Sequence, residues 1–222
     1  NNKNKGYGKI IGQIILSLYF LIMTVIYAYY APGGYLRIGE VKYVFFRNVT
    51  LPVLGFMLII VLCTLIRHPG LITEYYHRMS VTDWFAYGYF LAVMLSYLSS
   101  PYQEEALLGA DGWYMGTVMQ MTLVLLYFFF SVYFRYSAGW LTVWLTAASL
   151  VFLLGILNRY SIYPVAMQGQ TPVFISTMGN INWFCGYWSV TAPMGMTLYW
   201  CSDKRWQRVF AGFYSFVAML AG

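Results

Sequence analysis

The chain has 222 residues, of which 60% are hydrophobic and only 9% are charged, and its net charge is +6. Soluble domains contain roughly 25% charged residues, so this composition excludes an ordinary soluble domain and predicts an integral membrane protein. The positive charge is typical of basic residues that flank membrane spans and bind the anionic inner leaflet, and we expect no nucleic-acid partner.

Long apolar runs alternate with short segments that hold most of the charges, and the longer runs reach the roughly 20 residues that a helix needs to cross a bilayer. The sequence therefore predicts an all-α, multi-pass transmembrane helix bundle in the cell (inner or plasma) membrane. Pro193 is expected to bend the sixth span. The seven expected spans are 10–30, 51–66, 84–98, 113–134, 138–157, 181–200 and 206–222.

The basic residues of the loops predict a cytoplasmic N-terminus, because basic loops are retained in the cytoplasm. Nine of the 13 basic residues then lie inside. Segment 31–49 fits this orientation least well, and an amphipathic segment on the outer surface would reconcile its charges. The four cations left on the outer side are Arg37, Lys42, Arg47 and Arg159.

Several chemistries are disfavoured by the residues that are missing from the spans. No clear span has a charge in its interior, which argues against a retinal Schiff base or a proton relay. The three cysteines show no metal-binding spacing, so we expect neither a disulfide framework nor a metal site.

Acidic residues gather in one predicted outer loop, at Glu104, Glu105 and Asp111. Carboxylates of this kind can act as a base or hold the hydroxyls of a sugar. The alternative is a solvated loop with a turn at Gly109 and Gly112.

The predicted outer segment that follows the fifth span begins with a single cation, Arg159. A planar guanidinium can hold a phosphate group through two hydrogen bonds, which makes Arg159 a candidate ligand for a phosphorylated substrate. The alternative is an arginine at a helix end that extends its charge to the membrane surface.

The stretch "STMGNINWFCGYW", residues 176–188, opens the sixth span with many polar groups. Gly179 and Asn180 predict a turn, and Ser176, Thr177, Asn180 or Asn182 can cap the helix that follows. Two asparagines exceed what one cap requires. A helix N-terminus at the outer leaflet also suits an anion such as pyrophosphate.

The stretch "GNINWFCGYWSVTAPMGMTLYW" resembles the Gly-Asn-Pro-Asn segment of the bacterial O-antigen ligase and O-antigen polymerase family, and "EEALLGADGWYMGTVMQMTLVLLYF" is similar to that family's glycine-rich turn. The resemblance implies a membrane glycosyltransferase of polysaccharide biosynthesis in the cell envelope. Such enzymes move a glycan from a polyprenyl (undecaprenyl) pyrophosphate carrier to a saccharide or lipid-linked acceptor, outside the cytoplasm, and need no cofactor and no metal.

Carried over by position, Gly179, Asn180 and Asn182 match the family motif, and Arg159 is the candidate for holding pyrophosphate. Ile181 replaces the proline of the motif. The family has about twelve spans, with essential His and Arg residues near the end. The resemblance thus implies that residues 1–222 form a single transmembrane domain, the N-terminal part of a larger protein, and that the base lies beyond it. We expect this part alone to be inactive.

Two other classes of function stay open from the sequence. A flippase or transporter for lipid-linked glycans would also cross the membrane many times, but it should contain broken helices or a buried charge near the middle of the membrane. A non-catalytic membrane scaffold would need neither Arg159 nor the two asparagines.

Overall fold

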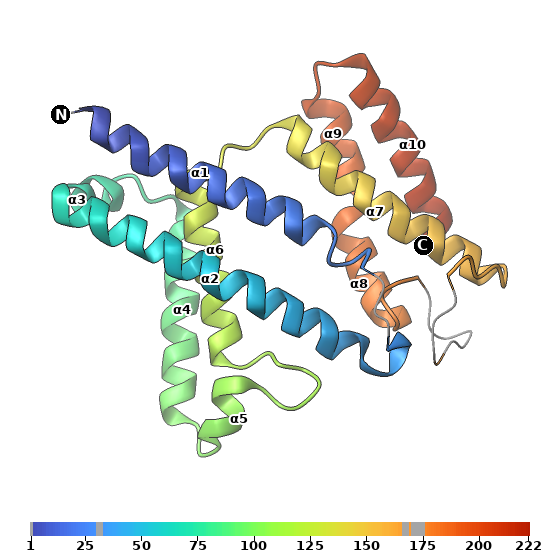
Figure 1. The fold of residues 1–222 in the computed structure, drawn as a ribbon, viewed down its shortest axis with the longest axis horizontal. Helices are drawn as coiled ribbons and strands as arrows, with labels where there is room; N and C mark the ends of the chain where they lie inside the picture. The colour runs from blue at the N-terminus through green and yellow to red at the C-terminus, as the bar shows by residue number, and fades with distance from the viewer. Residues whose placement is uncertain (1, 30–32, 166–168, 170–175) are drawn as a thin grey trace. The chain divides into compact units, whose positions relative to one another are not determined.

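The computed structural model describes residues 2–29, 33–165, 169 and 176–222 (Figure 1). Every regular element in these residues is a helix, which confirms the all-α prediction. The chain divides into two compact units. The first comprises Asn1–Tyr19 and Phe46–Arg135, and the second comprises Phe20–Phe45 and Tyr136–Gly222.

In the first unit, α4 and α6 pack side by side and the short α5 contacts the ends of both (Figure 1). The helices that contribute to this unit are α1 (Asn2–Thr24), α2 (Ile38–Arg67), α3 (Leu71–Tyr76), α4 (Val81–Ser99), α5 (Gln103–Leu108) and α6 (Thr117–Tyr133). A capping box starts α4: Ser80 accepts a hydrogen bond from the Asp83 amide, and Asp83 accepts one from the Ser80 amide. The hydroxyl of Tyr127 also donates to Asp83, at 2.9 Å, and so joins α6 to the start of α4.

In the second unit, α10 packs against both α7 and α9 (Figure 1). The elements introduced here are the 3₁₀ turn η1 (Gly34–Arg37), α7 (Ala138–Arg159), α8 (Ile181–Thr191), α9 (Met194–Cys201) and α10 (Arg205–Ala221). Leu145, Phe152, Leu198 and Tyr214 are fully buried in the core of this unit. The Tyr214 hydroxyl donates to the Thr191 carbonyl at 2.7 Å, where α8 ends.

The bend expected at Pro193 is confirmed, because the helix stops at Thr191 and starts again at Met194. Proline has no amide hydrogen and its ring displaces the carbonyl four residues earlier, so a continuous helix is unfavourable there. The predicted sixth span is therefore two short helices.

Segment 31–49 differs from the surface segment expected for it. Its residues from Ile38 onward form the first turns of α2, which runs without interruption into the apolar run 51–66. Arg37 and Glu40 form an ion pair at 2.6 Å just ahead of this run.

Length and composition alone identify two helices in the described residues that can cross a membrane, at Gly34–Arg67 and Ala138–Arg159. The helices Gly8–Thr24 and Thr117–Tyr133 are apolar but shorter. Membrane-capable helices are thus present, while seven spans and a cytoplasmic N-terminus stay predictions.

Candidate functional site

The predicted site residues fall into both units. Glu104, Glu105 and Asp111 belong to the first, whereas Arg159, Gly179, Asn180 and Asn182 belong to the second. Each unit also contains a pocket. We describe the second unit first, because it contains the polar stretch that opens the sixth predicted span.

Ser176 anchors this stretch and does not cap the helix. Its amide donates to the Asn158 side chain at 2.8 Å and its hydroxyl donates to the Val151 carbonyl at 2.6 Å. Its own carbonyl accepts a hydrogen bond from the Tyr35 hydroxyl at 2.5 Å. The buried side chain of Ser176 therefore ties the segment before α8 to α7 and to η1.

Asn180 is the residue that caps α8. Its side-chain oxygen accepts a hydrogen bond from the Asn182 amide at 2.8 Å, as an N-cap residue does. Gly179 before it has a φ of +85°, and a Cβ there would lie 2.9 Å from Ile38. These two positions of the motif thus have structural roles, which leaves the exposed side chain of Asn182 available for a ligand.

A groove of about 560 Å³ runs along α8 in the second unit. Most of its lining is apolar or aromatic and comes from α2, α7, α8 and the turn after α1. The side chains that matter here are Tyr27, Lys42, Trp144, Asn182, Trp183 and Tyr187. The groove combines a long apolar wall with one cation, a composition that suits an amphiphilic anion.

Lys42 supplies that cation. Its ammonium group donates hydrogen bonds to the carbonyls of Thr177, at 2.7 Å, and Tyr27, at 3.1 Å, and lies 5.6 Å from the centroid of the Tyr27 ring. It forms no ion pair with any carboxylate in the described part of the chain. Burial lowers the pKa of Lys42, which precedes the apolar run 51–66, from 10.5 to about 8.

The charge of Lys42 is therefore incompletely satisfied. An ammonium group has three donors, and the two carbonyl contacts occupy two of them. The one acidic residue close to it in sequence, Glu40, is paired with Arg37. A third N–H and a full positive charge are left for a bound anion.

Tyr187 lines the groove, and its hydroxyl is a second incompletely satisfied group, buried behind the lining surface. Its side chain is only 9% exposed, and its hydroxyl makes no well-aligned hydrogen bond with a described residue, although the indole of Trp144 lies near. Its ring packs on that of Tyr27 with centroids 4.7 Å apart. A buried polar group without a partner is unfavourable. The hydroxyl has almost no accessible surface, so a ligand oxygen in the groove would bind it only once the side chain turns toward the groove.

Arg159, the cation chosen from the sequence, is exposed at the end of α7 and does not line the groove. Sequence reasoning missed Lys42 and Tyr187. The signal for Lys42 was its presence in the outer segment whose charges fitted the predicted orientation least well. Tyr187 lies within the polar stretch 176–188, but nothing distinguished it from the other tyrosines among the 22 of the chain.

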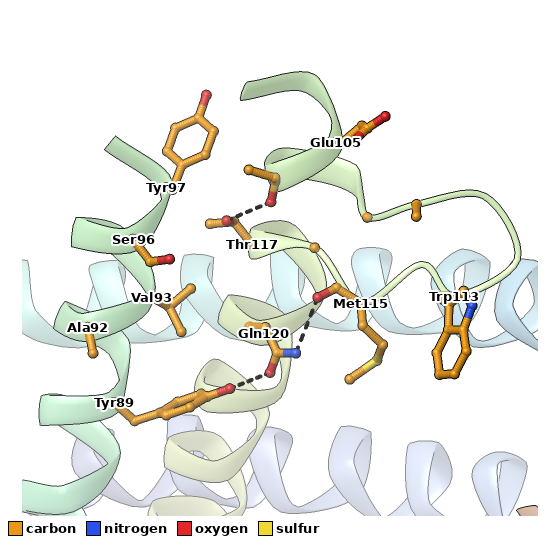
Figure 2. A pocket seen from close by; sticks show the side chains of 14 residues that line it. Tyr89, Ala92, Val93, Ser96, Tyr97, Glu105, Trp113, Met115, Thr117 and Gln120 are labelled. Carbon is orange, nitrogen blue, oxygen red and sulfur yellow. Dashed lines mark hydrogen bonds between the residues drawn. The ribbon is translucent and has the colours of Figure 1, made fainter. Parts of the chain in front are cut away.

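The pocket of the first unit, about 490 Å³, lies between α4, α5, α6 and the loop that joins α5 to α6 (Figure 2). The Tyr89 hydroxyl donates to the Gln120 side-chain oxygen at 2.6 Å, and the Gln120 amide donates to the Met115 carbonyl at 3.3 Å. The Thr117 hydroxyl donates to the Ala106 carbonyl at 2.9 Å. These bonds fix the polar wall of the pocket, and they are drawn in Figure 2.

Of the three acidic residues predicted here, only Glu105 lines the pocket. Glu104 is exposed on α5, and Asp111 is exposed on the loop that follows it. Gly109 and Gly112, where the alternative interpretation placed a turn, have φ values of +87° and +85°. The backbones of Gly109 and Gly116 come close together at the two ends of the loop. A Cβ on Gly116 would lie 2.3 Å from the Gly109 amide nitrogen, so only glycine fits at position 116.

No family model matches the chain, and neither a curated protein nor a solved structure matches it. The resemblance to the O-antigen ligase and polymerase family therefore stays a prediction. No group of three or more His, Cys, Asp and Glu side chains in the described residues is arranged to hold a metal ion.

Proposed function

We propose that the chain belongs to a multi-pass membrane glycan transferase that takes a glycan from a polyprenyl pyrophosphate carrier and adds it to an acceptor sugar hydroxyl on the extracytoplasmic side. The observation that supports this most is the apolar groove in which Lys42 lies without a carboxylate partner. Such a groove suits a ligand with a negative head group and a long apolar chain.

Exposed apolar side chains support the multi-pass arrangement. They occur on helices that length and composition alone do not identify as able to cross a membrane. On α4, the side chains of Phe85, Leu95 and Leu98 are 75%, 66% and 64% exposed. Large apolar side chains exposed to this extent on a soluble protein would favour association, whereas lipid covers them in a membrane. We propose seven spans with the N-terminus in the cytoplasm.

Each polar group of the groove has a place in this chemistry. The third N–H of Lys42, the Tyr187 hydroxyl and the Asn182 amide would bind phosphate oxygens, and the aromatic wall would pack against the isoprenoid chain. In the transfer, the acceptor oxygen attacks the anomeric carbon of the donor, and the bond from that carbon to the pyrophosphate breaks. The pyrophosphate leaves with the electron pair, and a fixed cation stabilises this charge. The acceptor hydroxyl gives its proton to a base as the new glycosidic bond forms.

A transporter or flippase for lipid-linked glycans is the second candidate. The interruption of the sixth predicted span at Pro193 favours it, because broken helices with nearby charges form the substrate sites of many transporters. Both candidates bind the same lipid pyrophosphate in the same groove. They differ in whether the glycan leaves its carrier.

The test replaces Lys42 by Met in the complete encoded protein, expressed in cells that lack the native gene. We expect Lys42→Met to abolish surface polymer at normal protein level and to accumulate the lipid-linked donor. The matched control is Arg37→Gln, which removes an exposed cation five residues earlier and should leave the polymer intact.

The location of the accumulated donor separates the two candidates. In a transferase defect the donor collects on the outer leaflet, where a glycosidase added to spheroplasts digests it. In a transport defect it stays protected on the inner leaflet. Normal polymer in the Lys42→Met strain would contradict both.

A further inference from the structure

The pocket of the first unit differs chemically from the groove of the second. Its lining includes three aromatic side chains, Tyr89, Tyr97 and Trp113, together with hydroxyl, amide and carboxylate groups (Figure 2). Its volume of about 490 Å³ lies within the range of about 300–1,000 Å³ that is typical of small-molecule sites.

Several groups of this lining keep hydrogen-bonding capacity after the contacts within the described chain are counted, and three of them matter here. The Ser96 hydroxyl and the Glu105 carboxylate have no described partner. Gln120 is held from both sides by Tyr89 and Met115, which leaves one of its two amide hydrogens available. The pocket thus offers a fixed donor, a carboxylate acceptor and a hydroxyl that can do either.

The charge of the pocket disfavours a phosphorylated ligand. Glu105 is the one charged side chain in its lining, and no lysine or arginine contributes to it. Glu104 lies next to it in α5, and Asp111 follows in the same loop. A phosphate here would be repelled without any cation to compensate.

An uncharged ligand with several hydroxyls and an apolar face meets all of these conditions. Sugars pack the C–H face of the ring on aromatic side chains, and their hydroxyls bind carboxylates and amides in pairs. Trp113 lines the pocket from the loop after α5 and is 74% exposed, so its ring is accessible to such a ligand.

We propose that the pocket between α4, α5 and α6 is a binding site for an uncharged saccharide. Only the identity of the saccharide rests on the proposed function: if the protein is a glycan transferase, the saccharide is its acceptor glycan. Binding itself requires neither the lipid carrier nor transfer.

The test measures binding of a defined probe to the complete encoded protein in detergent. The probe is the free oligosaccharide released by mild acid from the cell's own lipid-linked glycan, and saturation-transfer NMR reports its contacts. Glu105→Gln and Trp113→Ala should each weaken binding by about tenfold or more. Glu104→Gln, the matched control on the neighbouring residue, should bind like the unchanged protein.

Three results would overturn the proposal: unchanged binding in both pocket variants, equal loss in Glu104→Gln, or tighter binding of the glycan 1-phosphate than of the free sugar. Preferential binding of choline would also overturn it, since that would indicate an aromatic site for a cation. Thermal unfolding of each variant separates lost binding from a lost fold, and Trp113→Phe should retain most of the affinity.

Polymer production by Lys42→Met, compared with oligosaccharide binding by the pocket variants, tests the saccharide site separately from the transferase function. If Lys42→Met leaves polymer intact while Glu105→Gln still loses the oligosaccharide, the saccharide site stands and the transferase assignment fails. If polymer depends on Lys42 but no variant changes oligosaccharide binding, the transferase stands and this site does not.

Discussion

The ammonium nitrogen of Lys42 lies 2.7 Å from the carbonyl oxygen of Thr177. This contact joins the first turns of α2 to the segment that leads into α8, across 135 residues of sequence. A neutral carbonyl orients the lysine without cancelling its charge. The ammonium group is therefore fixed in position at the wall of the groove and keeps its charge.

The first prediction concerns pH. Because burial lowers the pKa of Lys42 to about 8, the side chain is charged below this pH and neutral above it. The diester pyrophosphate of a carrier-linked glycan stays ionised from pH 7 to 9.5, so its affinity should fall as the pH rises through about 8. Titration of the lipid-linked donor into the complete protein measures this.

Lys42→Arg is the control for that titration, because arginine stays charged throughout this interval. Its affinity for the donor should show no fall between pH 7 and 9.5, whatever its absolute value. Rising pH should have opposite effects on donor affinity, which falls, and on the free energy of unfolding, which rises. The unfolded chain keeps the proton up to about 10.5, so the free energy of unfolding without ligand should rise between pH 8 and 10.5. A fall in this interval would contradict the burial of a charged Lys42.

Tyr187→Phe removes the buried hydroxyl that lacks a well-aligned partner. Leaving such a group unpaired costs about 1–3 kcal/mol, so the variant should be as stable as the original protein or more stable in the absence of ligand. Its affinity for the donor should fall by roughly five- to tenfold, or about 1–1.4 kcal/mol. Thermal unfolding with and without donor measures both. A destabilised variant would show that the hydroxyl is already satisfied.

Substitutions of Asn180 and Asn182 should have different effects on stability and on donor binding. Asn180→Ala removes the helix cap and should lower the free energy of unfolding by about 1 kcal/mol, while Asn180→Ser keeps it. Asn182→Ala should leave stability unchanged, because its side chain is exposed, but should weaken donor binding. Equal effects of the two alanine variants on stability would contradict this division.

Gly179→Ala should destabilise the protein by about 1–2 kcal/mol, because its φ is +85° and the new methyl group meets Ile38. The matched control is Gly212→Ala in α10, where a Cβ meets nothing within 4 Å. That variant should gain about 0.5–1 kcal/mol from helix propensity. Chemical unfolding of the two variants in the same detergent compares them.

The sequence predicted helices where apolar runs were long, and it located the interruption at Pro193. These features depend on residues close together in the chain. The short helices α3 and α5 were missed, because six residues are too few to show a period. The early start of α2 was missed because its first turns are charged.

The candidate site was harder to predict because its parts are distant in sequence. The groove brings Tyr27, Lys42, Trp144 and Tyr187 together, and of these only Tyr187 stands in the polar stretch that the sequence singled out. Asn182 was found from the polar stretch, whereas Arg159 was chosen as the nearest cation in sequence. The cation that lines the groove comes from a segment more than 100 residues earlier.

The most direct measurement reconstitutes the complete encoded protein in liposomes with the lipid-linked donor isolated from the host and a saccharide acceptor. We predict release of polyprenyl pyrophosphate together with an equal amount of new glycosidic linkage. Lys42→Met should lower both by at least about tenfold, equivalent to ~1.4 kcal/mol of transition-state stabilisation. Donor that crosses the bilayer unchanged with neither product, or turnover by Lys42→Met at the original rate, would contradict the account.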